Sequence, residues 1–364
     1  MRMSVVASLA CVAALSAGSA AAVPIAKFYA YPLDGDAFLP SVAGSTVADY
    51  VAGVNQLSGQ SGDSVGFLAS PGLKSRRLPV DPGMAWSEVF AVNDLGQVLG
   101  LVVPASGEPG GGFYVTSANG RRPTRQVPFS GQPVAMNDSA QILGYRVDQV
   151  TLLGDTFPVS RCLFSDGATP GSVRDIGAFG GLNAICEPHG LNSSGRLTGD
   201  SGLTPGGSPD HVTQAFLTGP DGLGMMNLGS FAPGQNSAGA AVNEHGVVVG
   251  WSTADDYIST HAFITGPNGA AMRDLGTLGG DNSSAVAVNS DGNVVGFAED
   301  ARGNNRAFVT SDDGVGMLDL LSITVRLPRS TFLTSVISIS NQGRIVVTDR
   351  DHHAYVLCPT IKCQ

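Results

Sequence analysis

Short apolar segments separated by Asn, Asp and Gly recur along most of the chain. The clearest copy is AVNSDGNVVG (residues 287–296), in which an Asn-x-x-Gly turn joins two runs of small and β-branched residues. This pattern is typical of a tight β-hairpin, in which Asn bonds the turn backbone and Gly adopts a positive φ. Related stretches, at intervals of 38 to 55 residues, begin at Asn55, Asn93, Asn137, Asn192, Asn243, Asn289 and Ser340.

Two further apolar segments follow most of these hairpins. We letter the segments of each unit A and B for the hairpin, C for the next (AFITG, residues 262–266) and D for the last (MRDLG, residues 272–276). Segment A at residues 284–288 is apolar at successive positions, which is typical of a strand buried on both faces. The repeat predicts an all-β fold, a β-propeller with seven four-stranded blades. A pair of β-sandwiches is the rival, but it does not explain seven equivalent copies.

One D segment is missing after the last C segment. The stretch AKFYAYPLDG (residues 26–35) is extended and apolar, and it ends in Leu-Asp-Gly where the internal copies have Asp-Leu-Gly. We predict that it is the missing D strand and that it closes the ring beside the C-terminal strands, leaving no exposed edge. A chance match of a degenerate segment is the alternative.

The N-terminal residues predict export. Arg2 precedes a mostly apolar run at residues 5–15, and three alanines end at Ala22. This is the pattern of a signal peptide over residues 1–22, too short for a membrane span, which leaves one propeller repeat domain over residues 23–364. A retained anchor, or lipidation at Cys11 in SLAC, are alternatives. We expect a secreted monomer, periplasmic or extracellular, with no transmembrane segment in the mature chain.

The cysteines predict disulfides. Cleavage removes Cys11 and leaves an even number in an exported chain, which favours pairing. Three connectivities are possible, and proximity in sequence favours Cys162 with Cys186 and Cys358 with Cys363. The first bridge would join a C strand to the A strand of the next blade. No pair has the spacing of a zinc or redox motif.

The net charge and composition limit the kinds of partner that we expect this chain to bind. The formal net charge is −10, and it becomes −11 when Arg2 is removed with the signal peptide. Such a chain repels phosphate backbones, so nucleic acid is not expected as a partner. The 49 Gly and 21 Pro with only 14% charged residues fit many short strands joined by turns.

A cation loop is the other interpretation of the Asn-x-x-Gly turn. Calcium loops need carboxylates at fixed positions, and the repeats do not share them. The position of Asp291 is occupied in four other units by Leu95, Ser139, Ser194 and His245. We therefore interpret the motif as a turn.

The segments HAFITG (261–266), MRDLGTLGG (272–280) and SSAVAVNSDGNVVG (283–296) together resemble the HAF family of extracellular repeat proteins. The match spans nearly the whole mature chain and is sharpest over residues 214–320. The resemblance implies a bacterial, exported protein without an established activity, so it adds nothing about chemistry. The triplet is complete only at His261, with a near copy at His353, and we expect packing or surface hydrogen bonding from both.

No catalytic motif is present in the sequence, and we assign no catalytic residue, metal ligand or cofactor. No G-x-S-x-G elbow lies between a strand and a helix, and the sialidase box is missing. The connections between segments B and C vary most, which is typical of a binding rim on a fixed scaffold. Solvated loops without a function are the alternative. Two such connections of consecutive blades hold the predicted ligand-binding residues Asp210, His211, Asp255, Asp256 and Tyr257.

These patterns lead to two functional hypotheses. The first is a non-enzymatic scaffold that binds a protein or a glycan through this rim. The second is a secreted polysaccharide-processing enzyme, a lyase or a glycosidase, built on the same propeller.

Overall fold

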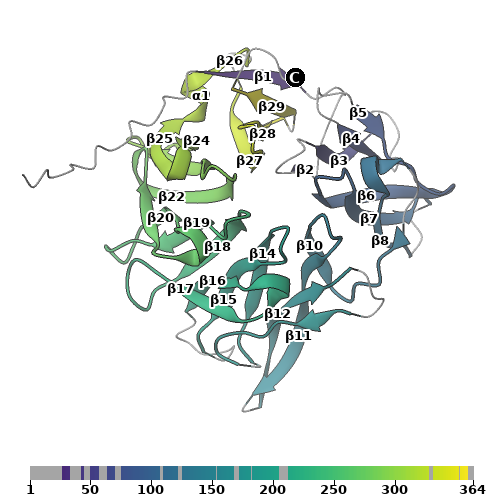
Figure 1. Cartoon of the computed structure of the whole chain (residues 1–364), viewed down its shortest axis with the longest axis horizontal. Coiled ribbons are helices and arrows are strands. Elements are labelled where there is room, and N and C mark those ends of the chain that lie inside the picture. The colour runs from purple at the N-terminus through teal and green to yellow at the C-terminus, as the bar shows by residue number, and fades with distance from the viewer. Residues whose placement is uncertain are drawn as a thin grey trace, which may run out of the picture.

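The described residues form a ring of seven β-sheets around a central axis (Figure 1). The computed structural model describes residues 27–32, 42–44, 50–56, 64–69, 75–106, 110–121, 125–152, 154–167, 172–181, 183–204, 212–327, 331–351 and 353–359. Six sheets have four strands and one has five. The fold is a seven-bladed β-propeller, as the repeats predict. Within these residues, the helices are all too short to cross a membrane.

Each blade runs from an inner A strand at the axis to an outer D strand. Blade 1 contains β2 (Val42–Gly44), β3 (Val51–Gln56), β4 (Ser64–Ala69) and β5 (Ser75–Arg77). Blade 2 contains β6 (Met84–Val92), β7 (Val98–Pro104), β8 (Gly112–Val115) and β9 (Arg125–Gln126). Blade 3 contains β10 (Gln132–Met136), β11 (Ile142–Leu152), β12 (Asp155–Ser165) and β13 (Arg174–Asp175). Blade 4 contains β14 (Cys186–Leu191), β15 (Leu197–Gly202), β16 (Thr213–Thr218) and β17 (Met225–Gly229).

The last three blades follow the same order. Blade 5 contains β18 (Ser237–Val242), β19 (Val248–Thr253), β20 (Thr260–Ile264) and β21 (Arg273–Gly276). Blade 6 contains β22 (Gly279–Val288), β23 (Val294–Asp300), β24 (Asn305–Ser311) and β25 (Val315–Asp319). Blade 7 contains β27 (Leu333–Ile339), β28 (Ile345–Asp349), β29 (Ala354–Cys358), β1 (Phe28–Pro32) and β26 (Thr324–Val325). The short helices are η1 (Ala118–Gly120), η2 (Pro220–Gly222), η3 (Pro267–Gly269), η4 (Asp312–Gly314) and α1 (Leu320–Ile323).

The N-terminal strand closes the ring, as predicted. β1 pairs antiparallel with β29, from Tyr29 opposite Cys358 to Pro32 opposite Tyr355. β26 then pairs parallel with β1 on its outer side. Phe28 is buried in the same core cluster as residues of β27, β28 and β29. The first and last described strands of the chain therefore share one sheet, and main-chain hydrogen bonds hold them together.

The turns that join A to B and C to D lie on one face. In blade 4 the N–H of Gly222 donates to the carbonyl of Gly195 at 2.8 Å, so η2 rests on the A–B turn of its own blade. In blade 5 the N–H of Gly269 donates to the carbonyl of Gly246 at 2.9 Å. We call this the A–B face.

The asparagine of the repeat links each A–B turn to the next blade. In blade 4 the Oδ1 of Asn192 accepts from the N–H groups of Ser194 and Arg196, at 3.1 and 3.0 Å, which closes the turn. Its Nδ2 donates to the carbonyl of Asn243 in blade 5 at 3.0 Å. The same inter-blade bond joins the turns of blades 2 to 7 through Asn93, Asn137, Asn192, Asn243 and Asn289. The hairpin interpretation of the motif is confirmed, and the motif also cross-links blades.

Two details of the repeat differ from the sequence analysis. Asn55 lies in β3, the second strand of blade 1, so the degenerate copy there does not form an A–B turn. The connection between B and C in blade 3 is not a loop, because β11 and β12 stay paired from Ile142 to Leu152 and form a long hairpin that projects from the ring (Figure 1). Neither difference changes the order of the strands.

The predicted disulfide between Cys162 and Cys186 is present. It joins β12 of blade 3 to β14 of blade 4, with a Cα–Cα distance of 5.3 Å and a sequence separation of 24. Cys358 is also disulfide-bonded, and its predicted partner Cys363 lies outside the described residues.

Candidate functional site

A β-bulge recurs in the inner strands of blades 2 to 7. In blade 4, Pro188 lies opposite Gly199 and Gly190 lies opposite Thr198, so the intervening residue of β14 is the extra one. A bulge of this kind redirects the side chain of the extra residue. The bulged residues, all of which line the central cavity, are Phe90, Val134, His189, Ala240, Val286 and Ile337.

The bulge also explains the last glycine of the repeat. A Cβ atom on Gly250 would lie 1.9 Å from the carbonyl oxygen of Ala238, and one on Gly199 would lie 2.0 Å from that of Glu187. The bulge presses the inner strand against the second strand at this point. Glycine therefore occupies the position because it has no side chain.

The central cavity has a volume of about 330 Å³. Blades 2 to 6 each line it with the run from the bulged residue to the second residue of the A–B turn, and blade 7 adds Ile337–Ile339 and Asn341. The bulged residues give it apolar walls in five blades and an imidazole, His189, in blade 4.

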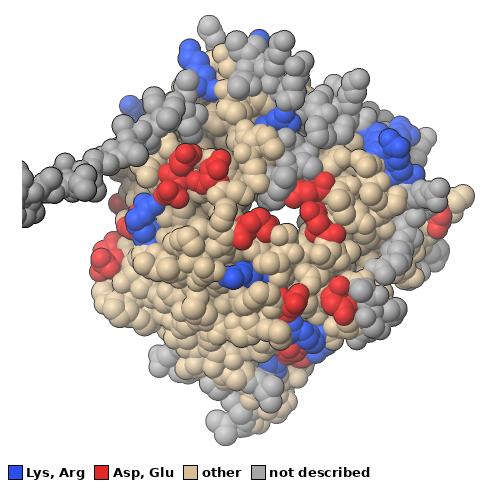
Figure 2. Space-filling view, viewed as in Figure 1, with Lys and Arg blue, Asp and Glu red and all other residues tan. Residues whose placement is uncertain are grey.

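Carboxylates surround the cavity where it opens on the A–B face. The second turn residues of blades 2, 3 and 5 are Asp94, Asp138 and Glu244, and Figure 2 shows acidic side chains gathered at the central opening. Asp138 accepts from the N–H of Asp94 at 2.8 Å, and Glu244 accepts from the N–H of Ser193 at 3.0 Å. Burial raises the pKa of Asp138, and the charges of Asp94 and Glu244 raise it further, against the backbone hydrogen bonds that lower it.

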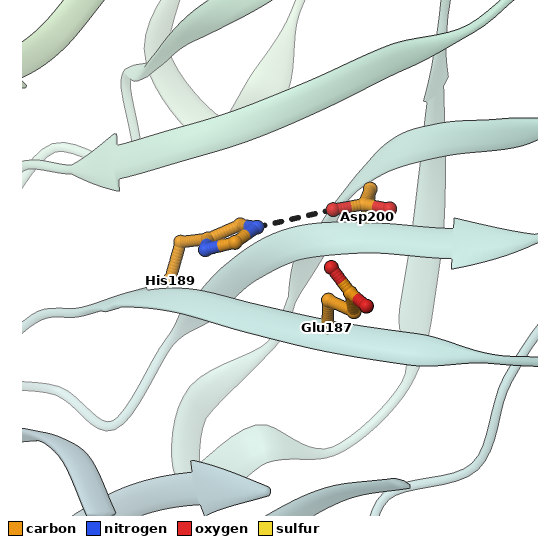
Figure 3. Close-up of side chains that lie close together, drawn as sticks. All are labelled: Glu187, His189 and Asp200. Carbon is orange, nitrogen blue, oxygen red and sulfur yellow. Dashed lines mark hydrogen bonds and ion pairs between the residues drawn. The ribbon is translucent and has the colours of Figure 1, made fainter. Parts of the chain in front are cut away.

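Three potential metal ligands lie together on blade 4. Glu187 and His189 alternate on β14, and Asp200 lies opposite Glu187 on β15. The Nε2 atom of His189 lies 3.1 Å from the Oδ1 atom of Asp200, and one ligand atom from each residue lies within 4.8 Å of the other two (Figure 3). Asp200 is 7% exposed, whereas Glu187 and His189 are exposed. The Cys162–Cys186 disulfide anchors β14 one residue before Glu187.

The equivalent positions of the other blades show that the scaffold does not require these side chains. In blades 2, 3, 5, 6 and 7, the cross-strand pairs at the positions equivalent to Glu187 and Asp200 are Glu88–Leu101, Gln132–Tyr145, Ala238–Trp251, Ser284–Phe297 and Ser335–Thr348. Among blades 2 to 7, blade 4 alone combines a Glu, a His and an Asp at the three positions. This group was not predicted, because the turns of the repeat carry no signal for it. An alignment of the EPHGL segment with its counterparts would have shown the histidine in an otherwise apolar column.

The predicted rim residues are only partly described. Asp210 and His211 lie outside the described residues. Asp255, Asp256 and Tyr257 lie between β19 and β20 as predicted. Both aspartates line a groove of about 620 Å³ together with residues that include Phe231, His261, Met272 and Asp274.

Asp256 stabilises the turn in which it lies. Its carboxylate accepts from the N–H groups of Ile258 and Ser259 and from the hydroxyl of Ser259, at 2.9, 2.8 and 2.6 Å. The hydroxyl of Ser259 and these N–H groups lower the pKa of Asp256 to about 2. The side chain therefore has a structural role whether or not it also contacts a partner.

His261 makes the surface hydrogen bond that the sequence analysis expected. Its Nδ1 lies 2.7 Å from the Oδ2 of Asp274 on the neighbouring D strand. The equivalent pair in blade 4 is Gln214 with Asn227, at 2.8 Å. The first position of the triplet thus forms a cross-strand pair whose chemistry differs between blades. His353 lies 3.2 Å from Asp349.

Comparison with known proteins shows the fold and nothing finer. No protein-family model matches the sequence, and no curated protein matches it. A prolyl endopeptidase structure is similar with a TM-score of 0.54 and 11% identity, over 89% of this chain and 47% of that one. Puromycin hydrolase gives 0.51 and 13%, over 92% and 55%. The β-propeller domain of the trilobed protease from Pyrococcus furiosus gives 0.49 and 12%, over 74% and 77%. The chain spans about half the length of the first two proteins.

Proposed function

We propose that this chain is an exported β-propeller that binds a partner rather than turns over a substrate, and that the partner enters the central cavity from the A–B face. The observation that carries the proposal is the cavity itself, because blades 2 to 6 each add the same five positions to it and blade 7 adds four of the equivalent positions. Export is supported by the signal-peptide pattern of residues 1–22 and by the Cys162–Cys186 disulfide.

The chemistry of the cavity favours a cationic group with an apolar stem. Asp94, Asp138 and Glu244 surround the opening, and the bulged residues Phe90 and Ile337 are among those that line the walls. A Lys or Arg side chain combines a charged end with an apolar stem. The partner would therefore be a protein that presents a basic side chain, and the acidic opening would attract it over a distance of about 10 Å at moderate salt.

The rim groove supports a second contact, with a polar partner such as a glycan. Its aspartates lie beside the apolar side chains of Phe231 and Met272. We propose Asp210, His211, Asp255, Asp256 and Tyr257 as residues of this contact.

A specific observation also favours the enzyme hypothesis. The 3.1 Å contact between His189 and Asp200 is the arrangement of an imidazole oriented by a carboxylate, which suits a general base. A polysaccharide lyase or glycosidase that used it would lose turnover in His189→Ala. Assay of the purified protein against a panel of oligosaccharides distinguishes the two hypotheses.

The binding proposal is tested with a short arginine-rich peptide. Fluorescence anisotropy should show binding that weakens as salt is raised. Asp94→Asn and Glu244→Gln, which keep side-chain acceptors but remove the charge, should each weaken binding by about tenfold or more, as expected for a charged contact. The matched control is Asp155→Asn at the exposed turn of the β11–β12 hairpin, which should leave the affinity unchanged. Equal affinity in all four proteins would contradict the proposal.

A further inference from the structure

We infer that Glu187, His189 and Asp200 form a binding site for one divalent transition-metal ion, of the Zn²⁺ or Mn²⁺ class, beside the central cavity. The inference is independent of the proposed cationic partner, because it depends on the side chains of blade 4 and not on the carboxylates around the opening.

The positions of the three side chains fit a shared ion. Neighbouring ligands of a metal with bonds of about 2.1 Å lie about 3.0 to 3.4 Å apart, and His189 Nε2 lies 3.1 Å from Asp200 Oδ1. A ligand oxygen of Glu187 lies within 4.8 Å of one ligand atom from each of the other two residues. Glu187 is exposed, so rotation about its side-chain bonds allows its carboxylate to approach the ion.

The donor set points to the class of metal. One imidazole nitrogen favours Zn²⁺ and other first-row transition ions, and two carboxylates are also ligands that suit Mn²⁺. The two carboxylate charges balance the charge of the ion. Three protein ligands leave at least one coordination position open to a water molecule or a bound partner, as in sites where the metal binds an exchangeable group.

Comparison of Asp200 with the equivalent residues of the other blades gives an independent argument for a bound metal ion. Asp200 is 7% exposed and occupies the position that Tyr145, Trp251 and Phe297 fill in other blades. A buried carboxylate in place of an aromatic ring costs free energy unless a positive charge or several hydrogen bonds compensate it. The fold accepts apolar groups here, so the need for a carboxylate lies in what it binds.

In a second cluster of similar composition, hydrogen bonds within the protein already compensate the buried carboxylate. Asp349, Asp351 and His353 also bring three ligand atoms together. The carboxylate of Asp349, however, accepts from the N–H groups of Asp351 and His353, and from the hydroxyl of Tyr355, and it contacts the His353 ring. These bonds complete the loop between β28 and β29, so this cluster serves as an internal control.

The test is calorimetric titration of tag-free, chelator-treated protein with ZnCl₂ and, separately, with MnCl₂. We expect one site per chain for at least one of the two ions. His189→Ala and Asp200→Asn should each weaken binding by about tenfold or more, as loss of a direct ligand does. His189→Ala introduces the residue that blade 5 already carries at this position, Ala240, so the fold tolerates it. Circular dichroism of each variant checks this.

The matched controls are His261→Ala, which removes the His261–Asp274 pair, and His353→Ala, which removes the His353–Asp349 pair of the second cluster. Both should bind the ion with unchanged affinity. Failure of wild type to bind either ion, equal affinity in His189→Ala, or loss of the site in His353→Ala would each overturn the inference. Asp94→Asn and Glu244→Gln should keep the metal site, so failure of the cationic-partner proposal gives a different pattern of results.

Discussion

The asparagine of each A–B turn uses one side chain for two purposes. The Oδ1 atom of Asn243 accepts from the N–H groups of His245 and Val247 at 3.0 Å each, while its Nδ2 donates to the carbonyl of Asn289 at 2.9 Å. Aspartate satisfies only the first requirement. Asparagine is therefore the residue that both closes the turn and joins the blades.

Because the Oδ1 and Nδ2 atoms of Asn243 have separate roles, Asn243→Asp should remove only the bond between blades. The variant keeps an acceptor for the turn but places a carboxylate oxygen against the carbonyl of Asn289, in a buried position. We expect the free energy of unfolding to fall by about 1 to 3 kcal/mol, the usual cost of a buried hydrogen bond lost with one partner left unsatisfied. Urea unfolding followed by circular dichroism measures it. Asn305→Asp, on the exposed part of β24, is the control, and an equal effect in both would contradict the argument.

Asp256 predicts a pH dependence at the residue scale. Its folded pKa of about 2 lies below the ordinary value of 3.8, so its contribution to stability is complete above that value and is lost as pH falls through about 2. An NMR titration of the carboxyl carbon should give a midpoint near 2. Ser259→Ala removes the largest cause and should move the midpoint toward 3.8, whereas Ser259→Thr keeps the hydroxyl and should not. A wild-type midpoint near 3.8 would show that the turn does not hold the carboxylate.

At the scale of the element, a hairpin or strand could be predicted from the sequence only where neighbouring residues in the sequence determine its structure. The A–B hairpins were predictable because Asn and Gly form the turn with neighbours in sequence, as at Asn243 and Gly246. Blade 1 was misassigned because its degenerate copy at Asn55 fixes no register, and a strand pattern alone does not say which strand it is.

The site was not predictable from the same signals. The bulge at His189 depends on how β14 pairs with β15, and the group with Asp200 forms across two strands. The rim residues were chosen for the density of their functional groups, and Asp256 proved to be a turn-stabilising residue. Periodicity therefore predicts the scaffold, while the side chains that depart from the repeat suggest the function.

The disulfide belongs to the same scale, since it joins two strands of neighbouring blades. Replacing both residues in Cys162→Ala/Cys186→Ala should lower the free energy of unfolding by about 3 kcal/mol, because the unfolded chain regains the freedom of the closed loop. Denaturant unfolding measures the change, and wild type treated with reductant, which also loses the disulfide of Cys358, should lose at least as much stability as the variant. An unchanged midpoint in both would show that blades 3 and 4 do not depend on this bridge.

At the scale of the whole molecule, stability depends on closing the ring. β1 is the only described strand N-terminal to blade 1, and it completes blade 7 by pairing with β29. Phe28 and Ala30 of this strand are buried in one core cluster with Leu357 and Val336. Without β1, the edge of β29 would be unpaired, and an exposed edge of this kind pairs with other chains.

This arrangement predicts the outcome of two N-terminal truncations. A chain that begins at Lys27 keeps β1 and should remain a folded monomer, because β1 begins only at Phe28. A chain that begins at residue 33 loses the strand, and we expect lower thermal stability and concentration-dependent association through β29. Size-exclusion chromatography with light scattering measures the association, and adding a peptide of residues 26–35 in excess should reverse it by refilling the edge. If the shorter chain stayed monomeric with the same melting temperature, closure by β1 would not stabilise the ring, and contacts between neighbouring blades such as the asparagine bonds would have to hold it alone.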